Sequence, residues 1–351
     1  MTVCYFGHYH PEHPRNVVFV QALRIAGFTV LEINHRGRGF SKYVRLARAL
    51  LENRKQIDLI IVGFPGQQSL VLAKLLFRGP VIFNPLVAQY DAVIGDREDY
   101  SKTSLYAAYL WFMDFLASHL ADKIILDCNA YIDYFVEHFK VRREKFSRIF
   151  LGAIEDVYKP LVIPVVPYEI HYHSTFLPTH GVDVIIRAAK ILEPEGISFI
   201  ISGKGPYFEA AKKLVADLGV KNVTIKGWLK STNELNEFIN SSWVSLGLFG
   251  LRPRTERIIG SKVFEAMATG KPIITSRTSA TEELLEDRES VLFVRPNNPA
   301  ELAEKILILK NDEALRQRLA RGSRQVYNQK ASLKVISQEL KKLIDEVSRK
   351  A

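Results

Sequence analysis

Apolar runs rich in valine and isoleucine alternate with helical stretches along the chain, in two successive series. Runs that are apolar throughout and separated by helices are typical of parallel strands in a sheet that helices cover on both faces. The strand-like runs of the first series are Val3–Phe6, Phe28–Ile33, Asp58–Gly63, Val81–Phe83, Lys123–Leu126 and Ser147–Leu151. Those of the second series are Glu169–His173, Ser198–Ser202, Asn222–Lys226, Val244–Leu248, Pro272–Thr275 and Val291–Val294. The pattern therefore predicts two doubly wound α/β units, one after the other.

The segment between the two series, Tyr158–Pro167, contains three prolines and no helical pattern, as is typical of a linker. A chain of 351 residues is too long for one ordinary core and suits two domains of about 150 residues with a tail. We expect a Rossmann-like domain over residues 1–160, a second over 161–330 and a C-terminal helix within 331–351. The amphipathic segment Ser332–Val347 is predicted to form that helix.

Composition and charge narrow the possible classes of protein. With 47% hydrophobic and 25% charged residues, neither a disordered nor a fibrous protein is expected. The chain has no visible leader, no long uncharged apolar stretch and two cysteines, so we expect a cytoplasmic location. A net charge of +10 suits nucleic acid, an anionic membrane surface or phosphorylated substrates. No zinc-ligand spacing or nucleic-acid-binding motif supports the first of these, and no nucleic-acid partner is expected.

The stretch Lys262–Thr275 predicts a short helix that is followed at once by a buried strand. Ser261 can cap this helix, Gly270 suits the left-handed position after its last turn, and Pro272 prevents its continuation. Glu265 then lies near the helix start, where backbone N–H groups favour an anion. The alternative is an exposed helix in which Glu265 pairs with the lysine three residues before it.

This order of elements resembles the donor-binding domain of the retaining glycosyltransferases of family four, which carry the motif Lys-x-x-Glu-Ala-Met-Ala-x-Gly-x-Pro. The resemblance covers residues 168–327 well and the first half of the chain more weakly. It implies an α/β fold of the GT-B type, with two Rossmann-like domains facing a central cleft and a C-terminal helix crossing back to the first domain. It also implies sugar transfer from a nucleoside diphosphate donor to an acceptor hydroxyl, with retention of the anomeric configuration and without a metal or other cofactor.

Several donor-binding positions follow from the resemblance. The residue that matches Glu265 holds the ribose hydroxyls of the donor nucleotide in this family. The turn Ser202–Pro206 matches a glycine-rich turn of the family and assigns Gly203 to the donor site, although structural turns use the same residues. Gly227 and Leu229 match positions at which the main chain lies against the nucleotide base.

The chain departs from the family at the cations that normally hold the donor diphosphate. An arginine and a lysine are expected there, and Thr175 and His180 occupy the two positions. We hypothesise that Lys262 and Arg254 hold the phosphates and the leaving-group charge, together with the backbone N–H groups of the helix start at Ser261. His180, if protonated, and Thr175 would support them. The alternative for the arginine is a solvated loop.

A second departure concerns the donor sugar. Family members carry another glutamate eight residues before the ribose-binding one, in contact with the sugar. This position is Arg257 here, and Glu256 lies one residue out of register. Either a local bulge restores Glu256 or sugar recognition differs.

The loop Gly7–Asn16 follows the first strand and so lies at the carboxyl end of the predicted sheet, where open α/β folds bind ligands. Gly7 is a candidate for the donor phosphates, and His8 and Arg15 are candidates for the acceptor. The histidines of this loop do not predict a metal site, because the loop is broken by prolines and lacks a set of carboxylates or cysteines.

The segment Asn84–Arg97 follows another strand, at the place where relatives carry a histidine on the catalytic face. No matching histidine is present, and Asp91 is our candidate for positioning groups at the reacting centre. Arg97 is an acceptor candidate, with an internal ion pair to Asp96 as the alternative.

A basic stretch, Arg36–Arg48, has a solvated helix face as its default interpretation. Together with the aromatic segment Tyr106–Met113 it could instead approach anionic lipid headgroups or a lipid-linked phosphate acceptor. Core packing is the alternative for the aromatic residues.

The sequence thus predicts a cytoplasmic GT-B glycosyltransferase that moves a hexose from a UDP-sugar to a sugar, lipid-linked or small-molecule acceptor. Peripheral contact with the inner membrane face is a further expectation. A GDP-mannose-dependent mannosyltransferase and a nucleotide-sugar epimerase or hydrolase of the same fold are competing predictions. A non-catalytic nucleotide-sugar binder is another, and a nucleic-acid-binding protein would depend on charge alone.

Overall fold

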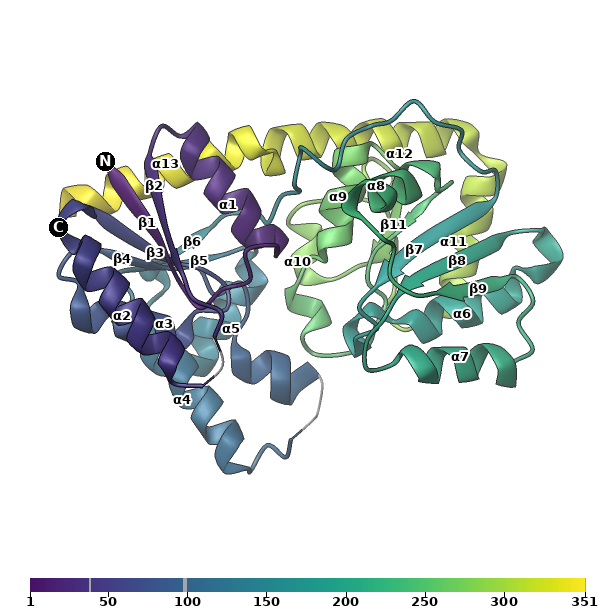
Figure 1. The fold of residues 1–351 in the computed structure, drawn as a ribbon. Coiled ribbons are helices and arrows are strands. Elements are labelled where there is room, and N and C mark those ends of the chain that lie inside the picture. Colours follow the sequence, from purple (N-terminus) through teal and green to yellow (C-terminus); the bar gives the residue numbers. More distant parts are fainter. Residues whose placement is uncertain (38, 97–99, 351) are drawn as a thin grey trace. The chain divides into compact units, whose positions relative to one another are not determined.

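The computed structural model describes residues 1–37, 39–96 and 100–350 and divides into two compact units (Figure 1). Unit 1 comprises Met1–Gly152 and Leu333–Ala351, and unit 2 comprises Ala153–Ser332. The proline-rich segment that we expected between the domains therefore lies within unit 2, and the division falls before it. The C-terminal helix α13 (Leu333–Lys350) belongs to unit 1, where it packs against α1 (Pro14–Ile25).

Unit 1 contains a parallel sheet with the strand order β2-β1-β3-β4-β5-β6. Its strands are β1 (Thr2–Gly7), β2 (Thr29–Asn34), β3 (Leu59–Val62), β4 (Val81–Phe83), β5 (Lys123–Leu126) and β6 (Phe146–Arg148). Besides α1 and α13, its helices are α2 (Ser41–Asn53), α3 (Gln67–Leu76), α4 (Leu105–Leu120) and α5 (Asn129–Phe139). The central strands are apolar throughout because α1 with α13 covers one face and α2, α3 and α4 cover the other (Figure 1).

Unit 2 contains two three-stranded parallel sheets with the orders β7-β8-β9 and β10-β11-β12. Their strands are β7 (Glu169–Ser174), β8 (Ser198–Gly203), β9 (Val223–Lys226), β10 (Ser245–Leu246), β11 (Ile273–Ser276) and β12 (Leu292–Val294). Trp243 N donates to Glu169 O over 2.9 Å, so the chain that leads into β10 lies beside β7 and connects the two sheets. The strand order therefore reverses at β7, and in open α/β sheets ligands bind at the carboxyl ends beside such a reversal.

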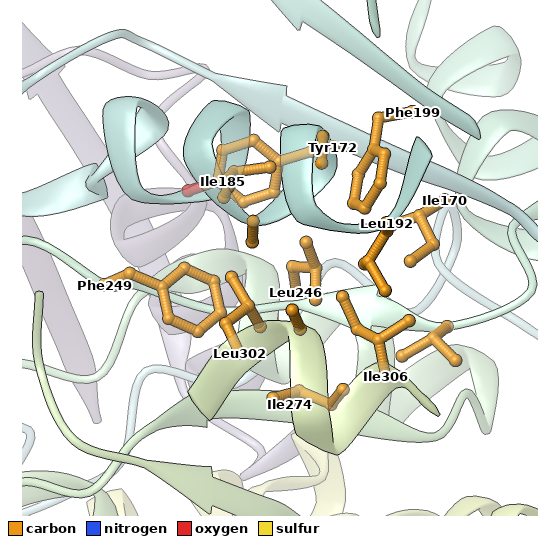
Figure 2. Close-up of a cluster of buried hydrophobic side chains, with 14 of the residues drawn as sticks. Ile170, Tyr172, Ile185, Leu192, Phe199, Leu246, Phe249, Ile274, Leu302 and Ile306 are labelled. Atoms are coloured by element: carbon orange, nitrogen blue, oxygen red, sulfur yellow. The ribbon is translucent and has the colours of Figure 1, made fainter. Parts of the chain in front are cut away.

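Helices also cover both faces in unit 2. They are α6 (Val182–Ile191), α7 (Phe208–Asp217), α8 (Thr232–Ser241), α9 (Ser261–Thr269), α10 (Ser279–Glu282), α11 (Pro299–Asn311) and α12 (Glu313–Val326). Figure 2 shows the core between the strands, α6 and α11, with Tyr172, Ile185, Leu246 and Ile306 among its members. Each large side chain in this core contributes about 1.5–3 kcal/mol by its burial. The loops at the strand ends are therefore carried by a tightly packed base.

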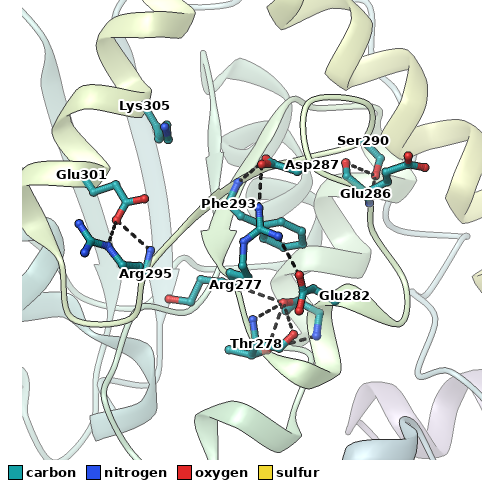
Figure 3. A network of polar contacts seen from close by, with 12 residues as sticks. Arg277, Thr278, Glu282, Glu286, Asp287, Ser290, Phe293, Arg295, Glu301 and Lys305 are labelled. Atoms are coloured by element: carbon teal, nitrogen blue, oxygen red, sulfur yellow. Dashed lines mark hydrogen bonds and ion pairs between the residues drawn. The ribbon is translucent and has the colours of Figure 1, made fainter.

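The loop after β11 is fixed by a polar network, which Figure 3 shows. Arg277 contacts Glu282 and Asp287, each over 2.7 Å, and its guanidinium lies 4.8 Å from the ring centre of Phe293. Thr278 begins α10 and exchanges hydrogen bonds with Thr281 in a capping box. The ion pairs are partly exposed and are each worth about 0–1 kcal/mol, so their main effect is on the shape of the loop.

Candidate functional site

Helix α9 begins after Gly260 and ends at Gly270, which has the left-handed φ of 70° that the sequence predicts. The predicted cap is wrong: Ser261 is the first residue of the helix, and the cap position is Gly260, which has no side chain to accept a hydrogen bond. The first turn of α9 therefore begins without a side-chain cap within the described part of the chain. Lys262 and Glu265 are both nearly buried, so the alternative of an exposed helix is also wrong.

Glu265 meets a histidine that the sequence analysis did not connect with it. Nε2 of His173, at the carboxyl end of β7, lies 2.7 Å from Oε2 of Glu265, and 18% and 5% of the two side chains are exposed. Apart from this contact, Oε2 of Glu265 is buried without a hydrogen-bond partner among the described residues. A buried carboxylate oxygen with so few donors is well suited to accept hydrogen bonds from a ligand.

Lys262 lies beside the same strand. Its Nζ is 5.0 Å from the ring centre of Tyr172, a cation–π contact. Burial lowers the pKa of Lys262 to about 8, against the opposing effect of the Glu265 carboxylate. The hydroxyl of Tyr172 donates to Gly247 O over 3.0 Å and lies 3.2 Å from His180 O, so this tyrosine joins the loops after β7 and β10. The lysine is thus a positioned cation that is still mostly protonated at pH 7.

His180 is a neutral residue, which corrects the expectation that it supports the phosphates as a cation. Its Nδ1 lies 2.8 Å from Ser174 Oγ. His180 is partly exposed as a whole residue, but its ring is surrounded by protein. This burial lowers the pKa of His180 well below the ordinary value. Electrostatic interactions with Lys262, His173 and Arg254 lower the pKa further. Burial of the ring, reinforced by these neighbours, is the physical reason why His180 does not carry charge itself.

The remaining donor candidates surround this region of unit 2. Arg254 precedes the short helical turn Thr255–Arg257, and its charge contributes to the lowered pKa of His180. Glu256 is exposed, and its Oε2 lies 3.4 Å from Ser279 N at the start of α10. The local geometry therefore directs Glu256 towards α10.

The turns after β8 and β9 lie against the loop that follows β7. Ser202 Oγ donates to Gly227 O over 2.7 Å, which holds the two turns together. A Cβ atom on Gly203 would lie 1.8 Å from Ser174 O, so this residue has to be glycine. Thr175 is exposed at the start of the loop, and Leu229 is partly exposed after β9. The structure thus brings Gly203 and Gly227 close together, with Gly203 packed against the start of the loop after β7.

In unit 1, the loop after β1 places Gly7 beside Ser69 and holds His8 through two contacts. The backbone N–H of His8 donates to Ser69 Oγ over 3.0 Å, and His8 Nδ1 lies 2.9 Å from His35 O. The loop's other histidines have separate contacts: His13 accepts from the N–H of Arg15, and His10 lies next to Arg36. Nowhere in residues 1–37, 39–96 and 100–350 do three or more potential ligands of the His, Cys, Asp and Glu types gather as a metal site would need.

Arg15 is fully buried, so its assignment to the acceptor is wrong. Its Nε donates to Asn84 Oδ1 over 2.8 Å and its Nη1 to Ile149 O over 2.9 Å, and its guanidinium lies 4.0 Å from the ring centre of Phe19. Burial lowers the pKa of Arg15 to about 10, and the nearby Asp127 opposes this, so the side chain remains charged. It ties α1 to the loops after β4 and β6.

We expect Arg15→Met to lower the free energy of unfolding by about 3 kcal/mol, because the substitution removes the buried donor of Asn84 Oδ1 and of the Ile149 carbonyl. Urea unfolding followed by circular dichroism measures the change. Arg24→Met on the same helix is the matched control, because Arg24 is exposed and pairs with Glu32, and its loss should cost below about 1 kcal/mol. Equal effects of the two substitutions would contradict the structural role of Arg15.

Asp91 and a neighbouring acid that the sequence analysis missed hold the segment after β4. Tyr131 donates to Asp91 Oδ2 over 3.0 Å, and only 4% of Asp91 is exposed. Asp114, inside the aromatic helix α4, accepts from the backbone N–H groups of Gln89 and Tyr90 over 3.1 and 2.8 Å. Burial raises the pKa of Asp114 to about 7, against the lowering effect of these hydrogen bonds. Arg97, our other candidate from this segment, lies outside the described residues.

The two doubly wound units with parallel sheets define the protein as one of GT-B fold, as predicted. Residues 155–326, which lie in unit 2, match the family described as glycosyl transferases group 1. The chain is therefore a glycosyltransferase, and the resemblance recognised in its sequence is confirmed. None of the helices in the described residues is long and apolar enough to cross a membrane.

Relatives in sequence agree with this assignment, and a solved structure agrees with the fold. An uncharacterised glycosyltransferase of Methanocaldococcus jannaschii is 26% identical over 249 residues, which are 66% of this chain and 68% of the relative. The alpha-D-kanosaminyltransferase of Streptomyces kanamyceticus is 29% identical over 170 residues, 48% of this chain and 42% of the relative, so the match spans less than half of that enzyme. The crystal structure of Anabaena HepE in complex with UDP-glucose has a TM-score of 0.76 at 16% identity and covers 99% of this chain and 100% of that chain.

Proposed function

We propose that the chain transfers a hexose from a UDP-sugar to an acceptor hydroxyl, with retention of the anomeric configuration. The observation that carries this proposal is the nearly buried Glu265 carboxylate, one oxygen of which contacts His173 and otherwise has no hydrogen-bond partner among the described residues. It comes from α9, the helix after β10, which also carries the nearly buried Lys262. A ribose diol donates two hydrogen bonds and so matches the unfilled capacity of this carboxylate.

The donor phosphates would lie at the start of α9. Lys262 supplies a cation there, and the uncapped backbone N–H groups from Ser261 onwards favour an anion. Arg254 is near enough to His180 to affect its pKa and would add charge on the same side. Thr175 and the turn at Gly203 would border the diphosphate, and Gly227 and Leu229 the base. The assignment of Gly7 to the donor phosphates stays a prediction.

The reaction would proceed on one face of the sugar. As the bond from the anomeric carbon to the diphosphate breaks, Lys262 and the helix start stabilise the departing charge, an effect commonly worth several kcal/mol. The acceptor oxygen then forms its bond to the oxocarbenium-like carbon from the same side. Its proton passes to a phosphate oxygen of the leaving group, so this course requires no strong protein base. Direct participation of Asp91 is disfavoured by its hydrogen bond to Tyr131.

Nucleotide binding tests the proposal directly. UDP, GDP and ADP are compared by thermal shift and by quenching of tryptophan fluorescence, for which Trp228 is 53% exposed beside the turn after β9. We expect UDP to stabilise the protein by about 2.7 kcal/mol at 100 times its dissociation constant. Stabilisation by GDP alone would favour the GDP-mannose alternative, and no response to any nucleotide would overturn the proposal. Release of free sugar from UDP-glucose without an acceptor would favour a hydrolase.

The lowered pKa of Lys262 predicts a specific pH dependence of donor binding. UDP binds the protonated lysine, so its apparent dissociation constant should be level near pH 7 and rise about tenfold per pH unit above about pH 8. Titration calorimetry between pH 7 and pH 9.5 measures this rise. In Lys262→Met the rise should vanish and binding at pH 7 should be about tenfold weaker, whereas Lys212→Met, at an exposed lysine of α7, should behave as wild type. A wild-type affinity that stays constant up to pH 9.5 would remove Lys262 from the phosphate site.

We further propose peripheral contact with an anionic lipid surface at the inner membrane face. The support is the start of α2, where Phe40 and Val44 expose 77% and 56% of their surface beside the basic Arg45. Co-sedimentation with vesicles tests this proposal. We expect binding to vesicles that contain phosphatidylserine, little binding to phosphatidylcholine alone, and loss of binding in Phe40→Asp/Val44→Asp. Absence of binding to both kinds of vesicle would contradict it.

A further inference from the structure

A pocket of about 400 Å³ opens in unit 1 at the carboxyl end of β1. Its walls come from α2, α3, α4 and the segment after β4, all within one unit. The side chains that give it its chemistry are His8, Lys42, Tyr43, Gln68, Tyr106 and Tyr109. The strand order of this sheet reverses at β1, so the pocket lies at the position where open α/β sheets bind their ligands. We call it the His8 pocket.

His8 lines this pocket, and its ring can offer a hydrogen-bond acceptor. Its Nδ1 lies 2.9 Å from the carbonyl oxygen of His35, and since a carbonyl can only accept, Nδ1 carries the proton. In the neutral ring Nε2 is then the acceptor. Burial lowers the pKa of His8, and the neighbouring Lys42, His10 and Arg36 lower it further. The ring is therefore neutral at pH 7, and Ser69 Oγ fixes its backbone.

The walls of the pocket are aromatic and basic. The rings of Tyr106 and Tyr109 are stacked, with centres 6.3 Å apart, and 43% and 46% of these residues are exposed. Gln68 Nε2 donates to the hydroxyl of Tyr109 over 3.1 Å and so fixes that ring. On the opposite helix, Nζ of Lys42 lies 5.1 Å from the ring centre of Tyr43. No acidic side chain is among the described residues that line the pocket.

This combination selects one kind of ligand. Aromatic walls favour an apolar or aromatic body, the lysine without an acidic neighbour in the lining favours an anion, and the histidine nitrogen favours a hydroxyl. We propose that the His8 pocket binds the acceptor of the sugar transfer, and that this acceptor is an amphipathic anion with an apolar body, a phosphate or carboxylate at Lys42 and a hydroxyl donating to Nε2 of His8. The inference rests on the proposed function and adds the substrate class of the acceptor side.

Three related compounds test the proposal by titration calorimetry on the full chain. The first is 1-octanoylglycerol 3-phosphate, which has all three features. Monooctanoylglycerol lacks the phosphate, and glycerol 3-phosphate lacks the apolar chain. We expect the first to bind at least about tenfold more tightly than either of the others, because each lacks one of the two main contacts. Equal binding of glycerol 3-phosphate would reduce the pocket to a plain anion site, and equal binding of monooctanoylglycerol would remove the role of Lys42; either result overturns the proposal.

Substitutions of pocket residues test whether the octanoyl compounds bind in this pocket. Lys42→Met should weaken the octanoyl phosphate about tenfold and leave monooctanoylglycerol unchanged, and Tyr106→Ala/Tyr109→Ala should weaken both octanoyl compounds about fivefold or more. His8→Phe should also weaken both, with His8→Gln retaining part of the affinity through its amide oxygen. Lys55→Met, at an exposed lysine after α2, is the matched control and should bind as wild type. Binding that is unchanged in the pocket variants would place the ligand elsewhere and overturn the proposal.

UDP titration of the same proteins distinguishes a failure of the acceptor inference from a failure of the proposed function. If UDP binds and the octanoyl phosphate does not, the acceptor inference fails while the donor proposal stands. If the octanoyl phosphate binds in a Lys42-dependent manner and no nucleotide binds, the pocket is real but the proposed function fails. Retained UDP binding in the pocket variants also shows that they are folded.

Discussion

Glu265→Gln is expected to weaken the binding of UDP about 100-fold. The carboxylate can accept two charge-assisted hydrogen bonds from the ribose hydroxyls, whereas the amide offers one neutral oxygen and an N–H₂ group that cannot accept. A loss of about 2.7 kcal/mol, within the range for hydrogen bonds to charged groups, corresponds to this factor. Titration calorimetry at pH 7 measures it.

The same substitution should have little effect on folding. Oε2 of Glu265 contacts His173 and otherwise lacks a hydrogen-bond partner among the described residues, so the folded protein gains little from this buried charge. We expect the melting temperature without ligand to change by a few degrees at most. Glu256→Gln is the matched control: Glu256 is exposed near α10, and its substitution should leave UDP binding unchanged. Unchanged UDP affinity in Glu265→Gln would show that the carboxylate does not hold the nucleotide.

The local features of α9 and the alternation of strands could be predicted because they depend on neighbours in sequence. Gly270 ends the helix as predicted, since only a short-range pattern is needed to recognise a left-handed position. The error at Ser261 is of one residue: the chain is already helical there, so the side chain cannot act as the cap. Cap assignments from sequence have this uncertainty because several adjacent residues fit the same pattern.

Contacts between distant segments could not be predicted in the same way. His173 meets Glu265 only because β7 and α9 are packed together, and the sequence of neither segment indicates this contact. Arg15 resembles a ligand-facing cation in sequence, yet its guanidinium is enclosed by Phe19 and backbone carbonyls. The available signal for the role of Asp114 was its charge inside an otherwise apolar helix. The aromatic residues around it favoured an interpretation as core packing instead.

The absence of the family's arginine and lysine clamp becomes easier to understand from the charges around His180. Burial lowers the pKa of this histidine most, and Lys262 and Arg254 lower it further, so other cations already act on this position. A further cation there would be repelled by its neighbours in the free protein. The position thus provides a neutral ring bound to Ser174, and the phosphate charge would be balanced mainly from the α9 side.

The turn after β8 provides the other large expected effect. We expect Gly203→Ala to lower the free energy of unfolding by about 3–5 kcal/mol and to abolish measurable UDP binding. The backbone has a φ of 140°, which L residues rarely adopt, and a Cβ atom would lie 1.8 Å from Ser174 O, which is backbone and cannot rotate away. Strain of about 1–3 kcal/mol and overpacking of a similar size add together here.

Gly196→Ala is the control that separates these two causes. Gly196 has a φ of 68° with no atom within 4 Å of its hypothetical Cβ, so it carries conformational strain without a clash and should cost about 1–2 kcal/mol. Urea unfolding and UDP titration are measured on both variants. The Ser174 carbonyl cannot move without its side chain, which contacts His180 Nδ1 and accepts from Phe176 N, so relief of the clash would distort the loop after β7. If Gly203→Ala costs no more than Gly196→Ala and binds UDP normally, this loop does not depend on the close approach of β8, and the donor site is not built around it.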